Sequence, residues 1–229
     1  MTEIMVAIAV FLITFFLGSI PWGLIISKVF YHKDIRDYGS GNIGTTNAMR
    51  TMGKGGGVAV FVLDFTKGLL SGVVGLIACL FFMPDGGFAA CDAASSASPY
   101  LLTRYSILAI STMGCTLGHI FSPWLHFKGG KGIAVAIGSL FITFGPIGAA
   151  IEILCVFVVL VVLTRYVSVG SIFSAIVCPF LAMYFLCGDP VGVVCCALTG
   201  ALVVWAHRGN IKRLFEGTER RVGEKKVKA

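Results

Sequence analysis

The sequence predicts an all-α integral membrane protein with seven transmembrane helices, its N-terminus outside and its C-terminus in the cytoplasm. Three observations predict this class. The 229 residues are 57% hydrophobic and only 13% charged, whereas about 25% of the residues in soluble domains are charged. The mean hydropathy is +0.92. The apolar residues form long runs, with most basic residues between them. This composition excludes an ordinary soluble globule and a disordered chain.

The apolar runs match the length that a bilayer requires, since about 20 helical residues cross its roughly 30 Å of hydrocarbon. The predicted spans are residues 4–29, 58–83, 105–125, 133–145, 147–163, 169–187 and 191–206, with a cytoplasmic tail over 207–229. Together they form one transmembrane domain, 1–229. Within the first span, Gly18-Ser19-Ile20-Pro21 predicts a kink, because proline cannot continue the helical hydrogen bonds. Residues 84–99 are predicted to form an external loop.

The run from Ile133 to Leu163 could be one long helix or a hairpin that turns near Gly145-Pro146. The positions of Lys and Arg distinguish these alternatives. Sixteen of the 18 basic residues lie in four segments, 28–54, 126–131, 164–168 and 207–228. Only the hairpin places all four segments on one side of the membrane, as the positive-inside rule requires. The net charge of +7 is therefore interpreted as a topology signal and not as a nucleic-acid-binding surface.

The eight cysteines are predicted to be small apolar residues of the spans. The sequence contains no C-x-x-C pair, so neither a zinc site nor a dithiol motif is indicated. We therefore expect no disulfide framework, no metal and no cofactor.

The first inner loop, Asp34 to Arg50, has the composition of a phosphate cradle. Three glycines within six residues allow backbone N–H groups to approach an anion closely. The candidate ligands are Gly39, Ser40, Gly41, Asn42, Thr46, Asn47 and Arg50. The alternative is a flexible glycine loop that binds nothing.

The second inner loop contains Lys128-Gly129-Gly130-Lys131-Gly132, directly before an apolar helix. Cations and free N–H groups at a helix N-terminus make an anion site. Anchoring by the positive-inside effect is the alternative, and it would need the lysines but not the glycines.

Three further features have weaker patterns. Ser168 and Ser171 stand at a helix start, where a serine can bind a ligand or cap the helix. The tail from His207 is basic and amphipathic, which is typical of a lipid surface. Asp64 and Lys67 have the i,i+3 spacing of an ion pair. His32 and Asp37 form H-x-x-x-x-D, a spacing of some glycerolipid acyltransferases, but the flanking residues do not extend that match.

Taken together, these segments resemble the PlsY family, the bacterial membrane acyl-phosphate:glycerol-3-phosphate acyltransferases. The motifs that carry the resemblance are Gly18-Ser19-Ile20-Pro21, Asp34-Ile35-Arg36, Gly39-Ser40-Gly41-Asn42, Thr46-Asn47, Arg50, Asp64, Lys67-Gly68, Gly118-His119, Lys128-Gly129-Gly130-Lys131-Gly132, Thr164-Arg165-Tyr166, Ser168, Ser171, His207, Asn210-Ile211, Arg213-Leu214, Gly217 and Glu219. Ser122 before Pro123 and Val135 depart from the family's usual pattern. These departures affect local helix geometry more than the reaction.

The resemblance implies transfer of an acyl group from acyl phosphate to the 1-hydroxyl of glycerol 3-phosphate, giving lysophosphatidate and phosphate. We expect direct attack without an acyl-enzyme. The catalytic candidates are Ser40, Arg50, Lys131, His207 and Asn210, and the substrate-binding candidates are Gly39, Gly41, Asn42, Thr46, Asn47, Lys128, Gly129, Gly130, Ser168 and Ser171. Ser40, Arg50, Lys131 and Asn210 would hold phosphate, with help from the Gly39–Gly44 backbone, Lys128, Ser168 and Ser171. His207 would orient the substrate or transfer a proton, and His119 would be structural.

We expect the protein in the bacterial cytoplasmic (inner) membrane, with its active site on the cytoplasmic face. Its expected partners are the two substrates, membrane lipid and an acyl-phosphate-forming enzyme of the same pathway, but no nucleic acid. Two other classes compete. A transporter of small anions or lipids would place its polar site near the midplane, whereas the polar motifs here lie on one side. A structural scaffold would leave Ser40, Arg50 and Lys131 unexplained.

Overall fold

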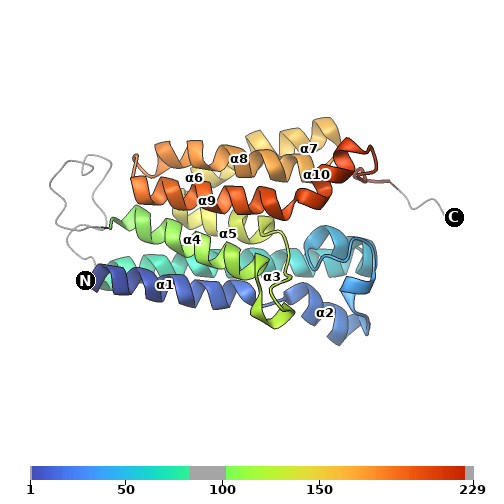
Figure 1. The fold of residues 1–229 in the computed structure, drawn as a ribbon, viewed down its shortest axis with the longest axis horizontal. Coiled ribbons are helices and arrows are strands. Elements are labelled where there is room, and N and C mark those ends of the chain that lie inside the picture. Colours follow the sequence, from blue (N-terminus) through green and yellow to red (C-terminus); the bar gives the residue numbers. More distant parts are fainter. Residues whose placement is uncertain (1, 83–101, 225–229) are drawn as a thin grey trace.

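The structure is a computed structural model that describes residues 2–82 and 102–224. Every regular element in these ranges is a helix. In Figure 1 the longer helices lie along one axis in an elongated bundle, with the start of α1 (Thr2–Ser19) and α10 (Arg208–Phe215) at opposite ends. The predicted external loop, 84–99, falls outside the described residues.

The first predicted span is interrupted at Pro21, where the sequence predicted a kink. α1 ends at Ser19, and α2 (Trp22–Tyr31) begins after Pro21. Pro21 has no N–H and its ring disturbs the preceding turn, which favours a break at this point. The carbonyl of Ile20 at this break accepts hydrogen bonds from the Trp22 N–H at 3.1 Å and from Lys67 Nζ at 2.9 Å. The break is therefore tied to the next helix.

The helices that follow pack through glycine. α3 (Thr45–Phe82) kinks at Gly53, where φ is 78°, and α4 (Arg104–Ile120) lies against α1 and α3. A Cβ atom on Gly18 would collide with the Cys115 carbonyl, and one on Gly118 with the Phe15 carbonyl. Small residues let helices approach this closely, which is a main source of helix association in lipid.

The run 133–163 turns as the hairpin prediction requires. α5 (Ile133–Thr143) ends at Phe144, and the chain turns at Gly145, where φ is 72°. α6 (Gly145–Ala150), the π-helical segment η4 (Ile151–Val158) and α7 (Val159–Thr164) then run back toward the end of the bundle where α5 began (Figure 1).

The last two long helices are α8 (Val167–Phe185) and α9 (Pro190–Ala206). The axis of α9 bends by 54° into α10. Two short 3-10 turns, η1 (Ile35–Asp37) and η3 (Pro123–Leu125), lie in the first and second inner loops.

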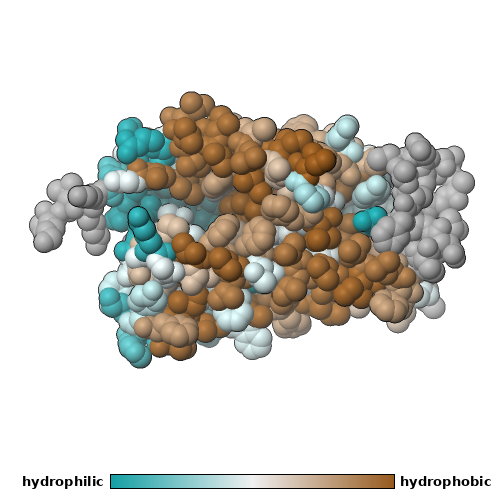
Figure 2. Space-filling model, turned by 180° about the vertical axis from the view of Figure 1, so that it is seen from behind, coloured by the Kyte–Doolittle hydropathy of each residue, from teal (hydrophilic) through white to brown (hydrophobic). Residues whose placement is uncertain are grey.

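In the described residues, four helical segments are long and apolar enough to cross a membrane. They are Thr2–Tyr31, Thr45–Phe82, Gly145–Thr164 and Val167–Phe185, and α9 with α10 makes a fifth if the bent pair is counted as one. α4 has 17 residues and α5 has 11, so the total of seven spans stays a prediction. Figure 2 shows apolar residues over the middle of the molecule and hydrophilic residues at the end that holds α10.

The cysteines differ from the prediction at one described position. Cys79, Cys115, Cys178, Cys195 and Cys196 are buried thiols, and Cys155 is an exposed thiol within η4, in the predicted span 147–163. Cys187, just after α8, is disulfide-bonded. The expectation that no disulfide forms is therefore wrong there, because spacing along the chain does not report which cysteines meet in space.

Candidate active site

Asn47 shapes the first inner loop from within. Its Oδ1 accepts a hydrogen bond from the Ser40 N–H at 2.8 Å, and its Nδ2 donates to three carbonyls of the same loop at 2.8, 3.0 and 3.2 Å. Gly39 and Gly41 have φ values of 65° and 69°, which non-glycine residues rarely adopt. Asn47, Gly39 and Gly41 thus hold the loop in shape, and their contact with substrate stays a prediction.

The glycines of the second inner loop also have their N–H groups engaged. The Gly129 N–H bonds to the Ile120 carbonyl at 2.9 Å, and the Gly130 N–H bonds to the His119 carbonyl at 3.0 Å. They satisfy carbonyls at the end of α4, which lack partners within the helix. This corrects the expectation of free anion-binding N–H groups at Gly129 and Gly130. Lys128 is exposed.

A buried polar cluster fixes the base of this loop. Lys67 Nζ lies 2.9 Å from Asp64 Oδ1 and 2.9 Å from His119 Nδ1, and all three side chains are buried. The predicted Asp64–Lys67 pair is confirmed. A Cβ atom on Gly130 would collide with the His119 ring, so the cluster sets the position of the residue before Lys131. His119 is structural in this sense, as predicted.

Glu219 joins the third turn to the tail. Its carboxylate accepts hydrogen bonds from Ser168 Oγ at 3.0 Å, Asn210 Nδ2 at 2.7 Å and Arg213 Nε at 2.7 Å. Nearby, the Val222 N–H bonds to the Arg165 carbonyl at 2.7 Å. The segment after α10 therefore folds back onto the start of α8.

These segments enclose a cavity of about 370 Å³ at the hydrophilic end of the bundle. The predicted site residues that line it are Ser40, Asn42, Thr46, Asn47, Arg50, Lys131, Ser168, Ser171, His207 and Asn210. The predicted residues that do not line it are Gly39, Gly41, Lys128, Gly129 and Gly130.

Five charged or titratable residues also line the cavity but were not predicted as site residues: Asp64, His119, Arg213, Glu219 and Arg220. Four of these, all but Arg220, stand in the family-like motifs of the sequence, so a signal for them was present. Their meeting in one cavity depends on the packing of α3, α4 and the tail. Arg220 stands in none of the motifs that carry the family resemblance.

Seven of the predicted lining residues form two groups with opposite hydrogen-bonding states. In the donor set, Ser40, Arg50 and Lys131, no side chain hydrogen-bonds to a residue of the described ranges. In the acceptor set, Ser168, Ser171, His207 and Asn210, each side chain already uses a hydrogen within the protein. For His207, Nδ1 lies 2.8 Å from the Val203 carbonyl. Because a carbonyl only accepts, Nδ1 carries the hydrogen and Nε2 keeps a lone pair.

Burial and neighbouring charge shift the pKa of three cavity groups outside the spans. Burial lowers the pKa of Lys131 to about 8, with Arg213 and Arg50 acting in the same direction. Burial also lowers the pKa of His207 to about 4, so this imidazole is neutral at pH 7. Burial alone would raise the pKa of Glu219, but hydrogen bonds from Asn210, Arg213 and Ser168 outweigh it and the net shift is downward.

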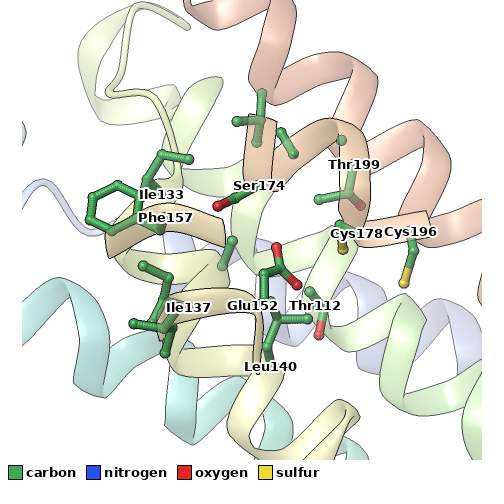
Figure 3. Close-up of a pocket in the computed structure, with 15 residues that line it drawn as sticks. Thr112, Ile133, Ile137, Leu140, Glu152, Phe157, Ser174, Cys178, Cys196 and Thr199 are labelled. Atoms are coloured by element: carbon green, nitrogen blue, oxygen red, sulfur yellow. The ribbon is translucent and has the colours of Figure 1, made fainter. Parts of the chain in front are cut away.

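A smaller apolar pocket of about 40 Å³ lies deeper in the bundle, between α4, α5, η4, α8 and α9 (Figure 3). Ile133, Ile137, Ile153 and Phe157 line both this pocket and the cavity. Glu152 projects into the pocket and is only 5% exposed. The π-helical segment η4 carries this side chain inside the bundle.

Comparisons with known proteins agree on one family. The family described as glycerol-3-phosphate acyltransferase matches residues 8–217. A glycerol-3-phosphate acyltransferase of Rhodopseudomonas palustris (strain BisB5) is 37% identical over 219 residues, covering 96% of this chain and 97% of that protein. One from Acaryochloris marina is 38% identical over 217 residues, covering 94% and 92%.

Two solved structures resemble the whole fold. The crystal structure of PlsY, an integral membrane glycerol 3-phosphate acyltransferase, in its glycerol 3-phosphate form has a TM-score of 0.76 and 34% identity, covering 95% of this chain and 96% of that one. Its lysophosphatidic acid form gives a TM-score of 0.73 and 33% identity, covering 95% of both chains. The structural similarity to both crystal structures extends over 95% of this chain.

Proposed function

The chain belongs to the glycerol-3-phosphate acyltransferase family, as an all-helical, multi-pass integral membrane protein, and on that premise we propose its reaction. It transfers a fatty acyl group from acyl phosphate to the 1-hydroxyl of glycerol 3-phosphate and releases lysophosphatidate and inorganic phosphate. One observation carries this proposal. Arg50 and Lys131 line a cavity that is polar at the hydrophilic end of the bundle and apolar where it enters the helices.

The donor set suits two phosphate-bearing substrates. Arg50 and Lys131 have no hydrogen-bonding partner in the described chain, so they can meet an incoming anion without first breaking a bond. Charge-assisted hydrogen bonds to phosphate are about twice as strong as neutral ones. The Ser40 hydroxyl adds a neutral donor beside them.

The apolar wall suits the acyl chain. Phe61, Phe65, Phe141 and Phe157, with Ile137, line the part of the cavity that lies among the helices. Burying methylene groups there is favourable by about 0.8 kcal/mol each. The acyl carbonyl would then lie where this wall meets the donor set.

The reaction is a direct displacement. The 1-hydroxyl oxygen attacks the acyl carbon, a carbon–oxygen ester bond forms, and the bond between that carbon and the phosphate oxygen breaks. The hydroxyl proton passes to His207 Nε2, whose lone pair is available, or to the departing phosphate. Because acyl phosphate is already an activated anhydride, orientation and charge stabilisation can supply most of the rate enhancement. No cysteine of residues 2–82 and 102–224 lines the cavity, which supports a mechanism without an acyl-cysteine.

We place the protein in the bacterial inner membrane with this cavity on the cytoplasmic face. The positive-inside distribution supports that orientation. The connection between α8 and α9, which contains the disulfide-bonded Cys187, lies at the opposite end of the bundle from α10 (Figure 1). This position fits an oxidising exterior. An enzyme that forms acyl phosphate is the expected source of the donor.

The test is to supply the purified protein in detergent with acyl phosphate and glycerol 3-phosphate and to measure lysophosphatidate and phosphate release. Equal amounts of both products are expected. A chain that releases neither product, yet moves phosphate or lipid across proteoliposomes, would be a transporter instead. Covalent acylation of a cysteine would contradict direct displacement.

A further inference from the structure

Glu219 determines which atoms two members of the acceptor set, Ser168 and Asn210, offer to a ligand. An ionised carboxylate can only accept hydrogen bonds, so each group that contacts it must turn a hydrogen toward it. Ser168 Oγ, Asn210 Nδ2 and Arg213 Nε all do so, at 3.0, 2.7 and 2.7 Å. The hydrogen bonds that hold the pKa of Glu219 low keep it ionised. Three donors near the cavity are thereby occupied.

This constraint fixes the orientation of the Asn210 amide. If the amide were flipped, its carbonyl oxygen would face the Glu219 carboxylate, and two acceptors would repel each other. With Nδ2 held by Glu219, Oδ1 is the free end of the side chain. Asn210 is only 6% exposed, lines the cavity, and its Oδ1 has no hydrogen-bond partner within the described residues.

An unpaired buried oxygen destabilises the protein unless a ligand pairs with it. Oδ1 can pair only with a donor, and the oxygens of a phosphate dianion are acceptors. A glycerol hydroxyl is a donor. The neighbouring groups repeat this pattern, since Ser168 and Ser171 have donated their hydroxyl hydrogens and His207 presents the lone pair of Nε2.

We propose that Glu219 is a positioning residue that holds the Asn210 amide so that Oδ1 accepts a hydrogen bond from a hydroxyl of the polyol-phosphate substrate. This inference rests on the proposed function and deepens it. It assigns the acceptor set to the glycerol end of the substrate and the donor set to its phosphate. It also revises the expectation that Asn210 binds phosphate.

The experiment measures binding to the full-length protein in detergent, without acyl donor, by calorimetry. The two probes are glycerol 3-phosphate and inorganic phosphate, which differ by the glycerol group. The variants are Asn210→Ala, Glu219→Ala and the double variant. Glu216→Ala is the matched control, because this carboxylate lies on the same segment, pairs with Lys212 at the surface and does not line the cavity.

Asn210→Ala should weaken glycerol 3-phosphate binding about five- to tenfold, the effect of one hydrogen bond, and leave phosphate binding within twofold. Glu219→Ala should reproduce this selective loss, and the double variant should lose no more than the larger single loss, since coupled residues are not additive. Glu216→Ala should match the unmodified protein.

Three results would overturn the inference. Equal weakening of both probes by Asn210→Ala would show that Asn210 binds phosphate. Additive losses in the double variant would show that Glu219 does not act through Asn210, and unchanged glycerol 3-phosphate binding in Asn210→Ala would show that no hydroxyl bonds there. If Glu219→Ala fails to fold, the selectivity of Asn210→Ala still decides. The proposed reaction is tested separately. If the unmodified protein binds glycerol 3-phosphate but forms no lysophosphatidate when acyl phosphate is also supplied, the proposed reaction is refuted.

Discussion

The donor set and the acceptor set offer a ligand opposite hydrogen-bonding groups although they line the same cavity. Arg50, on α3, and Lys131, in the second inner loop, have hydrogen-bonding groups that are free within the described chain. The acceptor set, from α8 and the start of the tail, has already given hydrogens to Glu219 or to backbone carbonyls. The residue type alone therefore does not decide whether a polar side chain donates to a ligand or accepts from it. The hydrogen bonds that the side chain already makes within the protein decide this.

Removing either cation of the donor set should have the largest effect on kcat/KM. Arg50→Ala and Lys131→Ala should each lower kcat/KM for glycerol 3-phosphate about 100- to 1000-fold, the usual loss when one preorganised charge-stabilising group is removed. Steady-state assays of phosphate release check this. A loss below tenfold in both variants would place the phosphate site elsewhere.

His207 should matter next, through its unprotonated Nε2. His207→Gln keeps a side chain of similar polarity but removes the base, and it should lower kcat about 100-fold if proton transfer is its role. Measured KM values should change far less than kcat. A pure KM effect would make His207 a binding residue only.

The protonation of Lys131 should limit the reaction at alkaline pH. Because its pKa is lowered to about 8, the ammonium is present below that pH and is lost above it. We therefore expect kcat/KM to fall about tenfold between pH 7 and pH 9, since the slope reports the free enzyme. In Lys131→Arg this alkaline limb should disappear, because arginine stays charged. An unchanged limb would assign it to another group.

The smallest effects should come from side chains outside the cavity. Lys128 is exposed and does not line the cavity, and His32 is exposed on the surface after α2. Lys128→Ala and His32→Ala should each change kcat/KM by less than about twofold, as expected of surface positions. A large loss in Lys128→Ala would mean that the second inner loop moves when substrate binds.

Sequence reasoning was most successful where one residue imposes a local constraint. Pro21 predicted an interruption of the first helix, and α2 begins directly after it. The i,i+3 spacing of Asp64 and Lys67 predicted an ion pair, and the two side chains form one. It was less successful for glycines. Gly129 and Gly130 suggested anion-binding N–H groups, but the same residue type also permits close packing against His119. Composition cannot separate these two uses of glycine.

The sequence by itself determined the solvent of this protein, the family, and the group of polar segments that handle anions, because hydropathy, motif order and charge position are properties of the linear chain. Only the tertiary structure decided which atom each polar residue presents. Asn210 and Ser168 become acceptors because Glu219, nine and 51 residues away, takes their hydrogens. A hydrogen bond of this kind depends on distance in space, which spacing along the chain does not fix.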